Sequence, residues 1–359
     1  MRPALIAAAL STLVFAAYAS AALACTVTLK PDGNTAAIQH AIDKPGKVAP
    51  VVCLKPGVYR GARLLATRSA TLRRVGRDKV VLDAGGQGRA VTVVADGIDF
   101  RLEGITLTNG KVDRGGAVEN AKSSSITLID CWIFGNAATL HGGGAIAFSA
   151  GKLAVVRSRV TGNSGDRAAA IDLGGSVSAR LLGTLVADNE AKGTMDPPIR
   201  LSGQAQLEVS NSTIAYNSGS GIVLQPDGPG RRKLRVSSSI VMGRPDAVTV
   251  ARGEATDVSI ETSVLWGGYG FVALDLHTQR GLPGFTLKGS ERYRPERGSV
   301  AIALGNCADV AIRKDLTGLT RGARCTAGAL EAPAADIAAT LADRKKGQTR
   351  PKPKDWRDI

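Results

Sequence analysis

The chain repeats a short apolar pattern at an interval of about 26 residues. Each copy begins with a small residue, places an apolar residue two positions later and ends on Asn or Gly three positions after that. Alternating apolar positions repeated at this interval are typical of a solenoid, in which coils bury their apolar faces against one another. The small residues form one column, at steps of 24 to 28: Gly104, Cys131, Ser158, Thr184, Ser212, Ser238 and Thr262.

The column two residues later is expected to stack inside the coils. It reads Thr106, Ile133, Val160, Val186, Ile214, Ile240 and Val264. All members but the first are branched aliphatic residues, which favour strands. Thr106 departs from the pattern, and its neighbours Ile105 and Leu107 indicate a one-residue slip in that coil.

A third column consists of asparagines. Its members are Asn109, Asn136, Asn163, Asn189 and Asn217. Asn tolerates left-handed backbone and bonds its neighbours in turns, so we expect a structural ladder of stacked side chains here.

Two further strands follow each asparagine. After a variable loop, a glycine pair or its small equivalent introduces the first, as Gly143-Gly144 does before residues 145–148. The second follows at once, as at residues 125–129. With the apolar column these make three short strands per coil. The sequence thus predicts an all-β protein, a parallel β-helix with coils of about 26 residues.

The two ends of the solenoid need covers, because open coils expose strand edges. Thr35 to Ile42 carries apolar residues at helical spacing and is expected to form a short capping helix at the N-terminus. The predicted division is a signal peptide (1–24), an N-terminal cap and first coil (25–60), the β-helix (61–282), a C-terminal closing segment (283–332) and a disordered basic tail (333–359).

Several further segments carry a recognisable pattern: Asp32-Gly33, 37–42, 54–59, 81–86, Phe134-Gly-Asn136, 293–299, 315–318 and 328–331. These segments resemble the right-handed parallel β-helix superfamily, which includes pectate-lyase-like proteins and the repeats of polymorphic outer-membrane proteins. The resemblance covers roughly residues 25 to 331 and implies a right-handed solenoid with a C-terminal closing segment like that of many bacterial β-helix proteins. It is specific for the fold and weak for activity.

The first 24 residues read as a secretory signal. Arg2 precedes an apolar run from Ala4 to Ala17, and Ala22-Leu23-Ala24 predicts cleavage before Cys25. A membrane anchor is the alternative, although the run is short for a bilayer span. A lipid-modified Cys25 is another, although Ala22 is smaller than the residue usual there. We expect a secreted or periplasmic bacterial protein with no membrane span after processing.

Five cysteines in an exported chain predict disulfides. Their positions near the two ends favour the pairs Cys25–Cys53 and Cys307–Cys325. Cys131 is left over and falls on the column of small residues, so we expect it to be a buried thiol.

The chain is basic, with a formal charge of +15. Removal of Arg2 leaves +14, and the tail after Pro333 carries +3 of it. An exported basic protein meets acidic glycans, anionic envelope polymers or nucleic acid. The alternative is that the charge only keeps the protein soluble.

The resemblance implies a substrate groove along the first strand of each coil, walled by the loop after the asparagine turn. Alternation buries Ile171 and Leu173, so Asp172 is expected to face outward. The same register turns Glu119 and Arg200 outward on one ribbon. The loops above add further polar residues: Asp113, Arg114, His141, Asp166, Arg167, Lys192 and Asp196.

These side chains suit β-elimination of a uronic-acid polymer, which needs a cation at the carboxylate and a base for the adjacent proton. Arg200 or Arg167 is the candidate base or clamp, with Asp172 the third candidate catalytic residue. The candidates for holding Ca²⁺ are Asp172, Glu119 and Asp166. The candidates for substrate binding are Glu119, Arg114, His141, Lys192 and Asp196. A pair of carboxylates, Asp172 and Asp196, would instead suit hydrolysis.

Three functions remain open at this point. The first is an exported, monomeric β-helix protein that binds an anionic polysaccharide along an external groove, and in one hypothesis cleaves it. The second is a non-catalytic solenoid of the cell envelope or of the adhesin type. A nucleic-acid binder rests on charge alone and is the weakest of the three.

Overall fold

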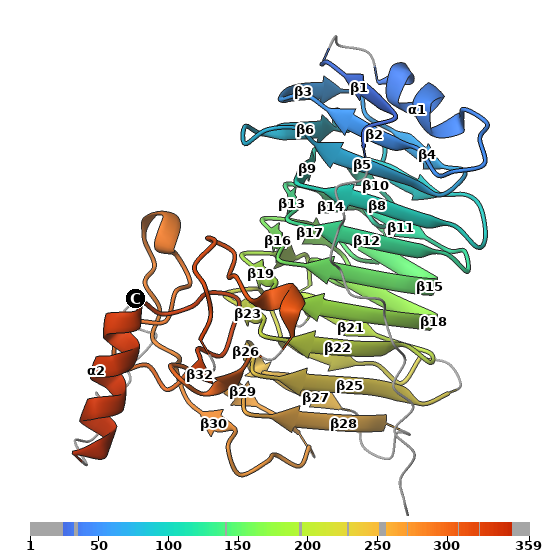
Figure 1. Cartoon of the computed structure of the whole chain (residues 1–359). Coiled ribbons are helices and arrows are strands. Elements are labelled where there is room, and N and C mark those ends of the chain that lie inside the picture. The colour runs from blue at the N-terminus through green and yellow to red at the C-terminus, as the bar shows by residue number, and fades with distance from the viewer. Residues whose placement is uncertain are drawn as a thin grey trace, which may run out of the picture.

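The computed structural model describes residues 24–31, 35–140, 142–193, 196–227, 230–250, 256–270, 272–307, 309–322 and 324–346. The chain winds into coils stacked along one axis, and strands one coil apart pair in parallel (Figure 1). The predicted all-β parallel β-helix is therefore confirmed. The helical elements of the described residues are α1 (Ala36–Asp43), η1 (Gly289–Glu291), η2 (Val310–Ile312) and α2 (Ala334–Lys345).

Each regular coil contributes one strand to each of three faces. The first-strand face contains β4 (Leu64–Ala66), β7 (Val91–Val93), β11 (Val118–Asn120), the start of β15 (Ile146–Val156), the start of β18 (Ile171–Leu182), β21 (Ile199–Leu201), β24 (Ile222–Leu224) and β27 (Val248–Val250). Short strands precede four of these in their coils: β10 (Lys111–Val112), β14 (Ala137–Ala138), β17 (Ser164–Gly165) and β20 (Glu190–Ala191).

The other two faces run beside it. The second-strand face contains β1 (Val27–Leu29), β2 (Val51–Leu54), β5 (Ala70–Arg74), β8 (Asp99–Glu103), β12 (Ser125–Ile129), the ends of β15 and β18, β22 (Gln206–Ser210), β25 (Arg232–Ser237) and β28 (Thr256–Glu261). The third-strand face contains β3 (Gly57–Arg60), β6 (Val80–Asp83), β9 (Ile105–Thr108), β13 (Trp132–Phe134), β16 (Arg159–Thr161), β19 (Leu185–Ala187), β23 (Thr213–Ala215), β26 (Ile240–Asp246), β29 (Val264–Gly268) and β30 (Gln279–Arg280).

The inner column of the third-strand face differs from the predicted column at both ends. Its members are paired from coil to coil and fully buried: Leu107, Ile133, Val160, Val186, Ile214, Val241 and Leu265. The predicted slip at Thr106 is confirmed, since Leu107 takes the inner position. The assignment of Ile240 and Val264 to this column is wrong, because both side chains point out of the coil and pack under the C-terminal segment.

The backbone at the corner before each third strand explains this shift. Ser238 and Thr262 have left-handed φ angles of 50° and 47° and form the corner itself, as Asp130 does at 52°. The small residue after the corner receives a hydrogen bond from the coil before it, and in the last coils this residue is Ser239 or Ser263. The predicted column of small residues therefore combined two different positions of the turn. At Ser238 and Thr262 it took the corner residue itself, and at Cys131 it took the residue after the corner.

The predicted asparagine ladder forms over four coils. The Nδ2 of Asn136 donates to Oδ1 of Asn163 at 3.0 Å, and the same contact links Asn163 to Asn189 and Asn189 to Asn217, both at 2.9 Å. Asn109 was wrongly included. Its own backbone is left-handed, with φ of 56°, and its side chain donates to Asp83 instead.

The N-terminal helix lies over the first coils as predicted. Ile38 and Ile42 of α1 are fully buried in the main core, which runs the length of the solenoid. At the other end of this core, Val272 is buried, and Tyr269 and Leu274 pack against it.

The segment 283–332 packs against the side of the solenoid rather than across its end. Its apolar residues, Tyr293 and Leu330 among them, cover the outward side chains of β19, β23, β26 and β29. In Figure 1 it lies beside the lower coils, with the pair β31 (Gly305–Asn306) and β32 (Arg324–Cys325) and helix α2 on the same side. Hydrogen bonds to the backbone of this segment come from several coils. At one end Arg157 Nη1 donates to Ala311 O at 2.7 Å, and at the other the Gly328 N–H donates to Ser238 O at 2.8 Å.

The prediction of a disordered tail is wrong for its first part. Residues Ala334–Lys345 form helix α2, in which alanine, the strongest helix former, is frequent. Thr340 is buried and its Oγ1 accepts the Gly298 N–H at 3.1 Å, while Arg344 donates to Ser299 O at 3.2 Å. The rest of the tail, 347–359, lies outside the described residues.

Both predicted disulfides form, Cys25–Cys53 and Cys307–Cys325, and Cys131 is a buried free thiol as expected. Within the ranges described above, no helix is long and apolar enough to cross a membrane. The segment predicted to be a signal peptide, 1–24, lies outside those ranges except for its last residue.

We predict that Asn163→Ala lowers the free energy of unfolding by roughly 2–4 kcal/mol, because it leaves buried polar groups in two neighbouring coils without partners. Asn163 is buried and bonds to Asn136, Asn189 and two carbonyl groups. Urea unfolding followed by circular dichroism measures this. Asn109→Gly, outside the ladder, is the control, and an equal midpoint for both variants would mean that the ladder does not stabilise the solenoid.

Burial raises the pKa of the Cys131 thiol to about 12. The thiol is therefore protonated at neutral pH and enclosed by the core, so we expect no reaction with a thiol reagent such as dithionitrobenzoate in the native state. Under non-reducing denaturing conditions one thiol per chain should react. Rapid labelling of the native protein would contradict this picture of a structural cysteine.

Candidate functional site

The predicted outward ribbon exists with the expected register on the first-strand face. Glu119 pairs with Ala147, Ala147 with Asp172, and Asp172 with Arg200. Because neighbouring strands lie about 4.8 Å apart, the polar members of this ribbon lie within reach of one another.

Arg200 and Asp172 are bonded to each other and buried. Nη1 of Arg200 donates to Oδ1 of Asp172 at 2.9 Å, and Nη2 donates to the carboxylate of Asp227, which follows β24. Asp172 is 7% exposed and Arg200 5% exposed. A guanidinium bonded to two carboxylates offers no acceptor site for a proton, so this arrangement suits a clamp and not a base.

A loop of glycines covers Asp172. Gly142 has a φ of 113°, and a side chain added there would approach Oδ2 of Asp172 to 3.2 Å and Cβ of Arg114 to 3.0 Å. Only a residue without a side chain fits so closely against both groups. At Asp172 the glycine loop therefore fills the space in which an open groove was expected. The ribbon is covered there and is not open to solvent.

Glu119 is held by two arginines. Nη1 of Arg89 lies 2.8 Å from Glu119 Oε2, and Nε of Arg114 lies 3.5 Å from Oε1. Arg89 also donates to the carbonyl groups of Gly115 and Arg114 at 2.8 and 2.6 Å, which ties the loop before β11 to the coil above. Burial lowers the pKa of Arg89, and the charges of Glu119 and Asp113 oppose this shift.

The remaining candidates lie in the loops of the following coils. Burial raises the pKa of Asp196, the charge of Asp166 raises it further, and Arg200 and Arg167 act in the opposite direction. Asp166, Arg167 and Arg200 thus lie within electrostatic range of Asp196. Lys192 is exposed, and its Nζ donates to Thr139 O at 3.0 Å. His141 lies outside the described residues.

The three candidate calcium ligands do not form a compact set. Among the described residues, one group of three His, Cys, Asp or Glu has its ligand atoms within 4.8 Å of one another, and it consists of Cys307, Cys325 and Glu331. The two cysteines of that group form a disulfide, so their sulfurs are not free thiolates. Asp172 and Glu119 instead hold arginines, as described above.

Sequence reasoning missed Arg89 and Asp227, which complete the two ion-pair groups. Both lie beside first strands, Arg89 two residues before β7 and Asp227 three residues after β24. The alternation of inward and outward side chains predicts the direction of residues within a strand. It predicts nothing for residues just before or after the strand. A search for charged residues flanking the ribbon in adjacent coils would have found both.

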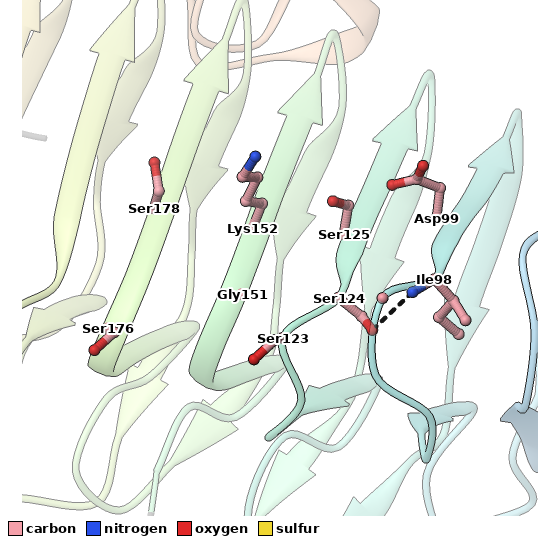
Figure 2. Close-up of a pocket in the computed structure, with 10 residues that line it drawn as sticks. Ile98, Asp99, Ser123, Ser124, Ser125, Gly151, Lys152, Ser176 and Ser178 are labelled. Carbon is pink, nitrogen blue, oxygen red and sulfur yellow. Dashed lines mark hydrogen bonds between the residues drawn. The ribbon is translucent and has the colours of Figure 1, made fainter. Parts of the chain in front are cut away.

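A polar pocket of about 360 Å³ lies at the start of the second-strand face. Figure 2 shows Asp99, Ser125, Lys152 and Ser178 side by side on the neighbouring strands β8, β12, β15 and β18. Ser124 Oγ accepts the Ile98 N–H at 3.1 Å and helps to form its floor. Hydroxyl groups with one ammonium and one carboxylate can bind a polar ligand.

The comparison with protein families supports the class that the coils define. The family model described as a right handed beta helix region matches residues 87–264. Together with the parallel stacking of the strands, this match shows that the chain has a right-handed parallel β-helix fold. Neither the curated proteins nor the solved structures contain a match to the chain.

We predict that Arg200→Met lowers the free energy of unfolding by roughly 3–5 kcal/mol, because it leaves the Asp172 carboxylate buried without its partner. Adding Asp172→Asn should restore part of this loss. Arg180→Met, which breaks the more exposed pair with Glu208, is the matched control and should cost about 1 kcal/mol or less. Urea unfolding measures all three variants, and equal losses for the two arginines would refute a structural role of the Arg200 clamp.

Proposed function

We propose that this is an exported protein that binds an anionic polysaccharide along the outside of its solenoid. The observation that carries the proposal is the distribution of charge. Residues 25–80 contain eleven Lys or Arg and three Asp, a net charge of +8 within the first coils. Exposed members of this group are Lys30, Lys44, Lys47, Lys55, Arg60, Arg63, Arg77 and Lys79.

Stacked coils suit a linear polyanion. Successive coils place equivalent positions about 4.8 Å apart along one axis, so cations on neighbouring coils form an extended series. Such a field concentrates a polyanion at the surface and accelerates its association. Export is supported by the predicted cleavage site after Ala24 and by two disulfides, which persist in oxidising compartments.

Binding is favoured over cleavage. The hypothesis of β-elimination needs a free base, and the hypothesis of hydrolysis needs Asp172 as one of two available carboxylates. Asp172 and Arg200 are buried and bonded to each other, and Glu119 is held by Arg89 and Arg114. These ion pairs also favour the second candidate function, a non-catalytic envelope or adhesin-type solenoid, which glycan binding would itself serve.

The experiment is sedimentation of the mature protein with pectate, alginate and a neutral dextran. We expect binding to the two polyuronates and none to dextran. Binding should be lost near 1 M NaCl, where the Debye length is about 3 Å. Equal binding to dextran, or no binding to either polyuronate at low salt, would refute the proposal.

The same samples decide between binding and cleavage. We expect neither new absorbance of unsaturated uronates nor new reducing ends, with or without Ca²⁺. Product formation that disappears in Asp172→Ala and Arg200→Ala, while both variants remain folded, would instead establish a polysaccharide-cleaving enzyme at the ribbon.

A further inference from the structure

The third-strand face is covered over only part of its length. From β19 to β29 the C-terminal segment buries its outward side chains, and the contact of Arg159 Nη2 with Leu316 O at 3.4 Å marks the border. Toward the N-terminus, Val58 is 42% exposed and Phe134 44% exposed on this face. Figure 1 shows the C-terminal segment beside the lower coils, away from β3 and β6.

Two aromatic rings and a lysine lie together on the uncovered part. The ring centroids of Trp132 and Phe134 are 5.2 Å apart, and Lys79 Nζ lies 5.4 Å from the Trp132 centroid. Trp132 Nε1 donates to Thr161 Oγ1 at 2.8 Å, which fixes the indole. The cation–π contact places the Lys79 ammonium group over the Trp132 ring, which in turn packs against the exposed Phe134 ring.

The backbone beneath this group is built to hold the Phe134 ring close. Gly162 has a φ of 62°, and a Cβ there would lie 2.9 Å from Phe134 Cε2. The registered neighbours of Phe134 on the adjacent strands are Thr108 and Thr161. The exposed Phe134 ring provides stacking area on this face.

The charge around the rings is mainly positive. Arg60 is exposed three coils before Phe134 on the same face, and Arg77 is exposed in the same turn as Lys79. Two acids are also near. Asp78 is exposed in that turn, and Asp83 Oδ1 accepts hydrogen bonds from Gly85 N and Asn109 Nδ2 at 2.8 and 3.0 Å.

We propose that this aromatic–basic face, formed by Arg60, Lys79, Trp132 and Phe134, binds a segment of a uronic-acid polysaccharide. The apolar face of one sugar ring packs on Phe134, and a carboxylate of the same polysaccharide segment pairs with Lys79. This inference rests on the proposed function and assigns it to a surface other than the ribbon of Asp172 and Arg200. Rings beside a lysine favour a planar-faced anionic ligand over a purely electrostatic partner such as a phosphate backbone.

The test measures the affinity of the mature full-length protein for oligogalacturonate by isothermal titration. Phe134→Ala should weaken binding roughly fivefold to tenfold through lost stacking area. Lys79→Gln should weaken it roughly threefold to fivefold. Both side chains are exposed or on the surface, so the melting temperature should stay within a few degrees of the wild-type value.

Two controls match these changes in chemistry. Arg280→Gln removes one positive charge from another cation–π contact, that with Tyr269, and Leu276→Ala removes an apolar side chain that is 97% exposed. Both should bind as the wild type does. Quenching of tryptophan fluorescence by the oligosaccharide that disappears in Trp132→Phe would support the same assignment.

The outcomes separate this inference from the proposed function. If the wild type does not bind any polyuronate, the proposed function fails. If the wild type binds but the Phe134 and Lys79 variants bind as tightly as their controls, the binding surface lies elsewhere and this inference alone is overturned. Tighter binding of single-stranded DNA than of oligogalacturonate, insensitive to Phe134→Ala, would also overturn it and indicate recognition by charge alone.

Discussion

The stacking of one coil on the next is the constraint on which the rest of this structure depends. The backbone groups of a parallel strand find their partners only in the coils above and below, at a spacing of about 4.8 Å. Each inward position must therefore suit its two neighbours in size, as the column from Leu107 to Leu265 does. The asparagine ladder obeys the same rule with polar groups, because Asn163 bonds to Asn136 in the coil before it and to Asn189 in the coil after it.

Much of the fold could be predicted from the sequence because stacking leaves a periodic record. The period, the three strands, the disulfides and the N-terminal helix all follow from it or from residue type. The register at Ser238 and Thr262 could not be predicted, because each is followed by a second small residue. Side-chain size does not tell which of the two takes the left-handed corner, and the backbone alone decides.

The candidate site divides in the same way. The alternating pattern correctly predicted that Asp172 and Arg200 point out of the coil. It did not predict that both side chains are buried all the same. Asp227 and the loop at Gly142 come from neighbouring coils and enclose the pair, which no pattern within one strand reveals. The Trp132 and Phe134 pair was missed for the opposite reason, since its exposure depends on where the distant C-terminal segment stops.

The attachment of that C-terminal segment has a consequence for how this architecture can change in evolution. The segment hydrogen-bonds to coils from Arg157 to Ser238. Its length therefore matches a fixed number of coils between these two residues. Gain or loss of a whole coil between those two residues would put its contacts out of step. The segment's apolar contacts reach back to the cluster that contains Ile129. Lengthening or shortening of the solenoid is therefore tolerated best in the coils before Ile129, at the N-terminal end of the aromatic–basic face.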